Sequence, residues 1–423
     1  MLRRTPARAA ASRPPDGPLA ALRPTLAVAG LYALGTLTWA TLGNVLSLPG
    51  GRWLAVHLFT LGVLSNLVTG LAFHFSTTLL HTPAPPRRFG RLALLNAGAL
   101  ALLAGLPAAW SWAVAAGATA LVAAVCWLYL DLRRMRRASL PGRFTFVVHI
   151  YERAVGAFVL GALLGALLGV GLLSGDWYGP ARVAHLHINA LGWGGLPLLA
   201  TMVFFGPTVM RTRIEPGAEA AAAPALRRAA TGLTVGVLAL LATGAGGPVA
   251  LAARLLAAAA LAVYAAGAAA VCLPVLRAVR RARPSAEARM LGAAAAWFLL
   301  AVVADVGVIA TGRLRLLDAL GAVLLAGVLG QAILGSAGYL APQLLGGADA
   351  RAAARRRLDT LPRLRPITLN LGVALVFAAG IIGRSGGAAG MWTARSGWAL
   401  VICTALAQLL LIIAALTRPS ATS

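Results

Sequence analysis

Twelve apolar stretches, separated by short polar loops, follow one another along this chain, and each is long enough to cross a lipid bilayer. A membrane-spanning helix needs about 20 predominantly apolar residues. Of the 423 residues, 60% are hydrophobic and only 11% are charged, whereas a soluble domain has about 25% charged residues. We therefore predict an all-α, polytopic membrane bundle of about 12 transmembrane helices. The expected helices cover residues 24–47, 53–80, 91–107, 109–131, 145–174, 183–206, 228–246, 248–276, 287–312, 314–345, 366–383 and 396–417.

The chain divides into one membrane domain and two short tails. Residues 1–23 are rich in Arg, Pro and Ala and are predicted to form a disordered cytoplasmic tail. The twelve-helix domain covers residues 24–417, and residues 418–423 form a second cytoplasmic tail. The first apolar run has no convincing cleavage site, so we expect a retained helix. No loop exceeds roughly 20 residues, the length of one helical span, so any chemistry must lie in the bundle or at its rims.

The arginines predict the orientation of this domain. A net charge of +26 would suggest a nucleic-acid partner in a soluble protein. Here 29 of the 37 arginines fall in the two tails and in every second loop, which leaves no case for nucleic acid. Because basic residues concentrate on the cytoplasmic side of a membrane protein, we expect a plasma-membrane protein with both termini in the cytoplasm. Its one certain partner would be the lipid bilayer.

All six histidines lie in the first half of the chain. On the predicted topology His57, His185 and His187 lie at the outer, arginine-poor ends of their helices, whereas His74, His81 and His149 lie toward the inner ends. Imidazole in an apolar bundle is costly unless it is paired, ligated or facing a cavity, and it suits iron, copper and zinc. The outer set therefore predicts a metal or haem site formed by His57 with His185 or His187. The alternative is that these residues cap helix ends at the headgroup level.

A weak internal repeat has a period of four helices. The segment His57-Leu-Phe-Thr-Leu-Gly62 matches His187-Ile-Asn-Ala-Leu-Gly192, and the tenth helix has Ala322 and Gly327 at the same two places. This pattern predicts three quasi-equivalent arcs of four helices, with one aligned helix in each arc.

The segment from Arg182 to Thr201 is the most specific motif in the chain. It contains His185-Leu-His187-Ile-Asn-Ala-Leu-Gly192-Trp-Gly194-Gly195, followed by Ala200-Thr201. An Arg three residues before a His, then Gly-Gly and Ala-Thr, resembles the segment that carries a low-spin haem ligand in cbb-type oxidases. Together with twelve helices in three arcs, it is similar to subunit I of the haem-copper oxidase superfamily and to NnrS proteins. The first six helices also resemble actinobacterial membrane proteins of this type.

The resemblance implies a haem b or copper protein with His57, His185 and His187 as candidate cofactor and metal ligands. Helices seven to twelve contain no His, so the ligand set for oxygen reduction is incomplete. Electron transfer or nitric oxide handling is then the expected role, with a redox partner at the outer face. The competing interpretation is a cofactor-free permease or scaffold of the same architecture.

Arg254 and Asp305 are the only charges deep within the expected helices outside the histidine set. Charges inside a membrane are rare, usually paired and often functional. Their helices run antiparallel through an outer loop, which places both residues a few positions below the outer face. We therefore predict a structural ion pair between Arg254 and Asp305.

Overall fold

The computed structural model describes residues 19–43, 46–48, 50–85, 88–140, 142–281, 284–383 and 387–417, and these residues form helices and no strands. Eleven of the helices described are long and apolar enough to cross a membrane. A shorter apolar helix, α4 (Arg88–Gly105), occupies the third predicted position. The prediction of an all-α, polytopic helical bundle is confirmed.

The membrane-length helices follow the predicted order with somewhat different bounds. They are η1–α1 (Ala20–Leu42), α2–η2–α3 (Gly51–Leu80), α5 (Ser111–Ala138), α6 (Thr145–Gly169), η3–α7–η4–α8 (Gly175–Met210), α9–η5 (Ala218–Ala245), α10 (Gly247–Arg281), α11 (Ala286–Thr311), η6–α12–η7–α13–η8 (Leu314–Leu344), α15 (Leu364–Ile382) and α16 (Gly387–Thr417).

Two features lie outside the predicted set of helices. A short helix, α14 (Ala348–Leu358), occupies the loop before α15 and buries Ala354 and Leu358 against α16. Of the predicted N-terminal tail, only the part from Leu19 onward is described. There Leu19 and Leu22 are buried and α1 begins at Arg23, so the first helix starts just inside the predicted tail. The predicted tail at 418–423 lies outside the described residues.

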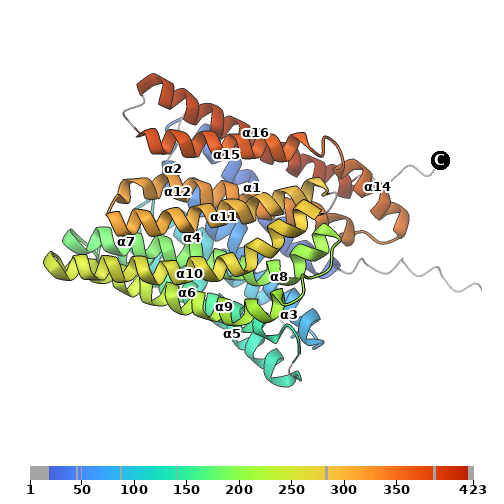
Figure 1. Ribbon diagram of the computed structural model, residues 1–423, viewed down its shortest axis with the longest axis horizontal. Coiled ribbons are helices and arrows are strands. Elements are labelled where there is room, and N and C mark those ends of the chain that lie inside the picture. Colours follow the sequence, from blue (N-terminus) through green and yellow to red (C-terminus); the bar gives the residue numbers. More distant parts are fainter. Residues whose placement is uncertain are drawn as a thin grey trace, which may run out of the picture.

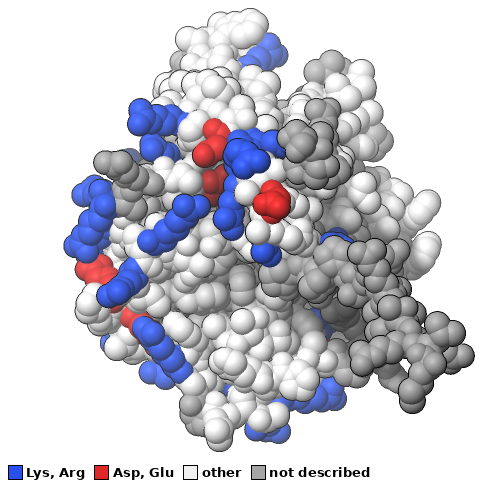
Figure 2. Space-filling view, turned by 90° about the vertical axis from the view of Figure 1, so that its right-hand side faces the viewer, with Lys and Arg blue, Asp and Glu red and all other residues white. Residues whose placement is uncertain are grey.

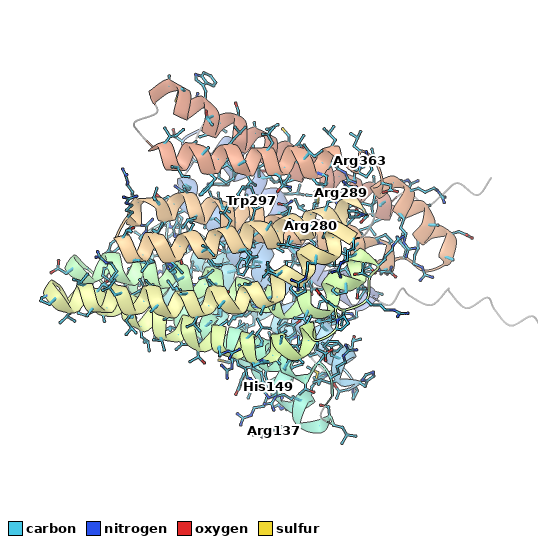
Figure 3. All side chains as sticks on the ribbon, in the orientation of Figure 1. Arg137, His149, Arg280, Arg289, Trp297 and Arg363 are labelled. Carbon is cyan, nitrogen blue, oxygen red and sulfur yellow. The ribbon has the colours of Figure 1, made fainter. Side chains whose placement is uncertain are left out.

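Most helices run roughly along the long axis of the molecule (Figure 1), and α15 and α16 pack together as a pair at one edge. Arg280, Arg289 and Arg363 lie toward the right-hand end of the molecule in Figure 3. Figure 2 looks onto this end and shows arginines spread over much of it, with few acidic residues among them. We call it the arginine-rich end and the opposite one the arginine-poor end.

Three π-helical segments interrupt the aligned helices of the predicted repeat. They are η2 (Leu58–Leu64) between α2 (Gly51–His57) and α3 (Ser65–Leu80), η4 (Ile188–Gly195) between α7 (Tyr178–His187) and α8 (Leu196–Met210), and η7 (Val323–Gly330) between α12 (Leu317–Ala322) and α13 (Gln331–Leu340). Each segment begins directly after one of the aligned positions His57, His187 and Ala322. Segments of π-helix are rare, and here one follows each of the three positions that the repeat aligns.

The aligned glycines explain part of this repeat, because each marks a close approach between helices. A Cβ atom added at Gly62 would lie 2.3 Å from the ring of Tyr32, and one at Gly192 would lie 2.6 Å from the Ala157 side chain. At Gly327 it would lie 2.9 Å from Val373. Helix packing in membranes depends on small residues at such contacts, so the same position is kept small in all three aligned helices.

Candidate functional site

The arginine-poor ends of the three repeat helices meet around one carboxylate. Asp318 on α12 lies 3.8 Å from Arg52 on α2 and 3.7 Å from Arg182 on α7. All three side chains are largely exposed, so these contacts contribute little to stability. They show, however, that the helix starts carrying His57, His185 and His187 converge at this end.

His57 ends α2, and one of its ring nitrogens has a hydrogen-bond partner within its own helix. Its Nδ1 donates to the carbonyl oxygen of Trp53 at 2.8 Å, and the two rings stack with centroids 4.1 Å apart. Because a carbonyl can only accept, the proton of the neutral ring is on Nδ1 and the lone pair is on Nε2. Nε2 has no hydrogen-bond partner in the part of the chain that the structure describes.

His185 has the same arrangement, but its supporting carbonyl comes from another helix. Its Nδ1 donates to the carbonyl oxygen of Gly161 on α6 at 2.9 Å. The ring also lies against Gly165, where an added Cβ would be 2.7 Å from the imidazole Cε1 atom. Nε2 again makes no hydrogen bond within the described ranges. An imidazole oriented through Nδ1 with Nε2 open is the usual state of a His ligand.

His187 is buried and differs from the other two, because both of its ring nitrogens are engaged. Nδ1 donates to the carbonyl oxygen of Val183 at 2.8 Å, and Nε2 lies 3.1 Å from each carboxylate oxygen of Asp305 on α11. One proton is therefore shared between the imidazole and the carboxylate. This contact joins α7 to α11 and leaves His187 no free nitrogen in this arrangement.

The prediction of an Arg254–Asp305 ion pair was wrong. Asp305 contacts His187 instead, and Arg254 has no acidic partner among the described residues. The Arg254 guanidinium lies against Gly312, where an added Cβ would be 2.5 Å from Nη1. Depth along the sequence placed all three side chains near the arginine-poor end, but depth alone does not say which faces of the helices meet.

The three remaining histidines lie apart from this site, and one of them borders a separate cavity. His74 lines a cavity of about 100 Å³ together with Thr25 and Arg91. His81 directly follows α3 and has a left-handed backbone conformation. The Nδ1 atom of His149 donates to the carbonyl oxygen of Thr145 at 3.1 Å, and His149 lies at the lower edge of the molecule in Figure 3.

His57 and His185 are the two histidines of this end whose Nε2 atoms make no hydrogen bond among the described residues. The described residues contain no group of three or more His, Cys, Asp and Glu side chains placed to hold a metal ion. Since Nδ1 of each ring donates to a carbonyl oxygen, each neutral imidazole carries its lone pair on Nε2.

Sequence reasoning did not find the residues that support these rings. Gly161 supplies the carbonyl that accepts from His185, and Gly165 leaves the space for its ring. The spacing of two glycines one helical turn apart on α6 is the only sequence signal for them.

No protein-family model matches the chain, and a search of the curated proteins gives no match either.

Proposed function

We propose that this membrane protein binds haem b or copper at its arginine-poor end through His57 and His185, and that it transfers electrons. The observation that supports this proposal is the shared state of the two rings: in each, Nδ1 donates to a backbone carbonyl and Nε2 has no hydrogen-bond partner among the described residues. The lone pair on Nε2 is what iron or copper requires of an imidazole. The proposal also rests on the resemblance to haem-copper oxidases.

The ligand set proposed here omits His187, because ligation through either of its nitrogens would break a hydrogen bond. Loss of the Asp305 contact would leave a carboxylate buried in the bundle, which is costly. Haem or copper bound by two imidazoles supplies one-electron transfer. Because helices seven to twelve contain no His, we do not extend the proposal to oxygen reduction. A redox partner would approach at the exposed rim near Arg52 and Arg182.

The test is the optical spectrum and metal content of the protein, purified in detergent after expression with added haem and copper. We expect a b-type Soret band or stoichiometric copper in the wild type. Both His57→Ala and His185→Ala should abolish it, whereas His74→Ala and His81→Ala should leave it unchanged. A wild-type protein that is colourless and free of metal would contradict the proposal and leave the cofactor-free permease or scaffold.

A second variant tests the space around His185 without removing a ligand. In Gly165→Ala the new methyl group would lie 2.7 Å from the imidazole Cε1 atom, so the ring must move. We expect a shifted or weakened cofactor spectrum. The matched control is Gly156→Ala on the same helix, because a Cβ there meets no atom within 4 Å. Equal spectra for the two variants would argue against His185 as a ligand.

We further propose that the arginine-rich end faces the cytoplasm, because basic residues favour that side. Reporter fusions after residues 140, 220 and 355 should behave as cytoplasmic. Fusions near residues 178 and 390 should behave as external. A reversal at either set of positions would contradict this orientation.

A further inference from the structure

Two helix-interior prolines border one cavity near the arginine-rich end of the molecule. Pro207 lies in α8 and Pro274 in α10, and both line a cavity of about 290 Å³. A proline inside a helix has no N–H to donate, so the carbonyl four residues earlier loses its helical partner. Those carbonyls belong to Val203 and Ala270, and both residues line the same cavity.

The cavity is apolar along its walls and has polar groups at one end. Its apolar lining includes Met202, Val271 and Val275. Thr212 also lines it, and its buried hydroxyl has no hydrogen-bond partner within the described ranges. A buried polar atom without a partner is uncommon in native structures, so the hydroxyl is a free group for a ligand.

Two arginines complete the polar end of the cavity. Arg213 and Arg281 both line it, and neither has an acidic partner in the part of the chain that the structure describes. Glu215 also lines the cavity, but its carboxylate is paired with Arg277 at 3.0 Å. Arg281 is the last residue of α10. Its neighbour Arg280 lies toward the arginine-rich end (Figure 3). The cavity therefore combines an apolar interior with a positive rim.

We propose that this cavity binds one anionic phospholipid, with its phosphate at Arg213 and Arg281 and an acyl chain between α8 and α10. Basic pockets between transmembrane helices are suited to anionic headgroups. Arginine presents several N–H donors to a phosphate, and the Thr212 hydroxyl adds one more donor. Free phosphate would satisfy the rim but leave the apolar interior empty, so the lipid matches more of the site. This inference does not depend on the proposed haem or copper site.

Native mass spectrometry of the purified full chain tests the proposal. The protein is delipidated in detergent and offered equal amounts of phosphatidylglycerol and phosphatidylcholine. We expect one phosphatidylglycerol to bind in preference. The double variant Arg213→Gln/Arg281→Gln should reduce that preference roughly 10- to 30-fold, since each basic residue near a membrane surface contributes about 1 kcal/mol. The matched control is Arg227→Gln/Arg228→Gln, which removes two exposed arginines of α9 that do not line the cavity.

A second pair of variants tests the acyl chain. Ala270→Phe fills the cavity and should reduce lipid occupancy at least several-fold, whereas Ala259→Phe, at an exposed position of the same helix, should not. Inorganic phosphate at millimolar concentration should fail to displace the lipid. Equal preference in the arginine variant and its control would overturn the proposal. Displacement by phosphate together with unchanged occupancy in Ala270→Phe would also overturn it, because it would identify a simple anion site.

Discussion

The repeat helices α2–η2–α3 and α12–η7–α13 both change from α to π geometry at the same aligned place, yet they carry different residues there. His57 precedes the first π segment and Ala322 precedes the third. After the first segment come Ser65 and Asn66, whose side chains are hydrogen-bonded. The aligned positions in the third helix are Gly330, which ends the π segment, and Gln331, which begins α13. The middle helix carries His187, which is paired with Asp305.

This difference separates what the backbone requires from what function adds. The third arc forms its π segment with Ala322 and Gly330, so neither a histidine nor a serine is needed for that geometry. What all three arcs share is the close-packed glycine at Gly62, Gly192 and Gly327. A histidine in an apolar bundle is costly, and one that the backbone does not require is a candidate for function. That reasoning applies to His57 and not to His187, which has a structural partner.

The largest effect is expected from breaking the His187–Asp305 pair. The third repeat helix has no such pair, because Ala322 stands at the aligned position. His187→Ala leaves Asp305 buried without a partner and should reduce the free energy of unfolding by about 3–5 kcal/mol. The double variant His187→Ala/Asp305→Ala should lose less than the sum of the two single losses. Tryptophan fluorescence during a denaturing-detergent titration measures these values. Arg254→Ala is the control and should reduce the free energy of unfolding much less. Additive losses in the double variant would show that His187 and Asp305 do not interact.

The sequence was sufficient to predict the positions of the helices along the chain. It was not sufficient to predict which face of each helix meets which neighbour. Hydropathy placed twelve apolar segments because lipid selects for length and composition, and both are local properties of the chain. The π segments have the same apolar composition as α-helix, so hydropathy could not distinguish them. Asp305 illustrates the remaining limit: His187 and Arg254 have nearly the same predicted depth, and only the packing of α7 against α11 decides between them.

The candidate site shows the same limit. Chemistry and depth selected His57, His185 and His187 as a group, and the structure brings their helix starts together at one end. The difference between His185 and His187 could not be predicted, because it depends on the Gly161 carbonyl and the Asp305 carboxylate of other helices. Residues two apart on a helix necessarily face different neighbours.

Close packing at the aligned glycines gives a second way to compare the arcs. In Gly62→Ala the new methyl group would meet three atoms of Tyr32 at 2.3–2.7 Å, and overpacking of this kind costs about 1–3 kcal/mol. Gly327→Ala should cost less, because its contacts with Val373 and Trp297 are 2.9–3.3 Å. The same detergent titration measures both. Gly321→Ala is the control, since a Cβ there meets nothing within 4 Å. A larger loss of stability in Gly327→Ala than in Gly62→Ala would contradict the packing.

The smallest effects are expected just after the π segments, where the first and third arcs differ most in hydrogen bonding. The Asn66 amide donates to the Gly62 carbonyl at 2.7 Å and pairs with Asn96 in both directions, at 3.0 and 2.9 Å. Asn66→Leu would leave the half-buried Asn96 Oδ1 without this donor and should cost about 1–3 kcal/mol. Gln331 is equally buried, but its amide has no hydrogen-bond partner among the described residues.

Gln331→Leu therefore removes a polar group that gains nothing from its surroundings and replaces it with an apolar side chain of similar length. Burying an amide without a hydrogen bond is unfavourable, so the free energy of unfolding should stay the same or rise slightly. Unfolding of Gln331→Leu and Asn66→Leu side by side in the same detergent measures the difference between the arcs. A loss of stability in Gln331→Leu as large as that in Asn66→Leu would show that the Gln331 amide is hydrogen-bonded in the membrane. The two arcs would then be equivalent at this position.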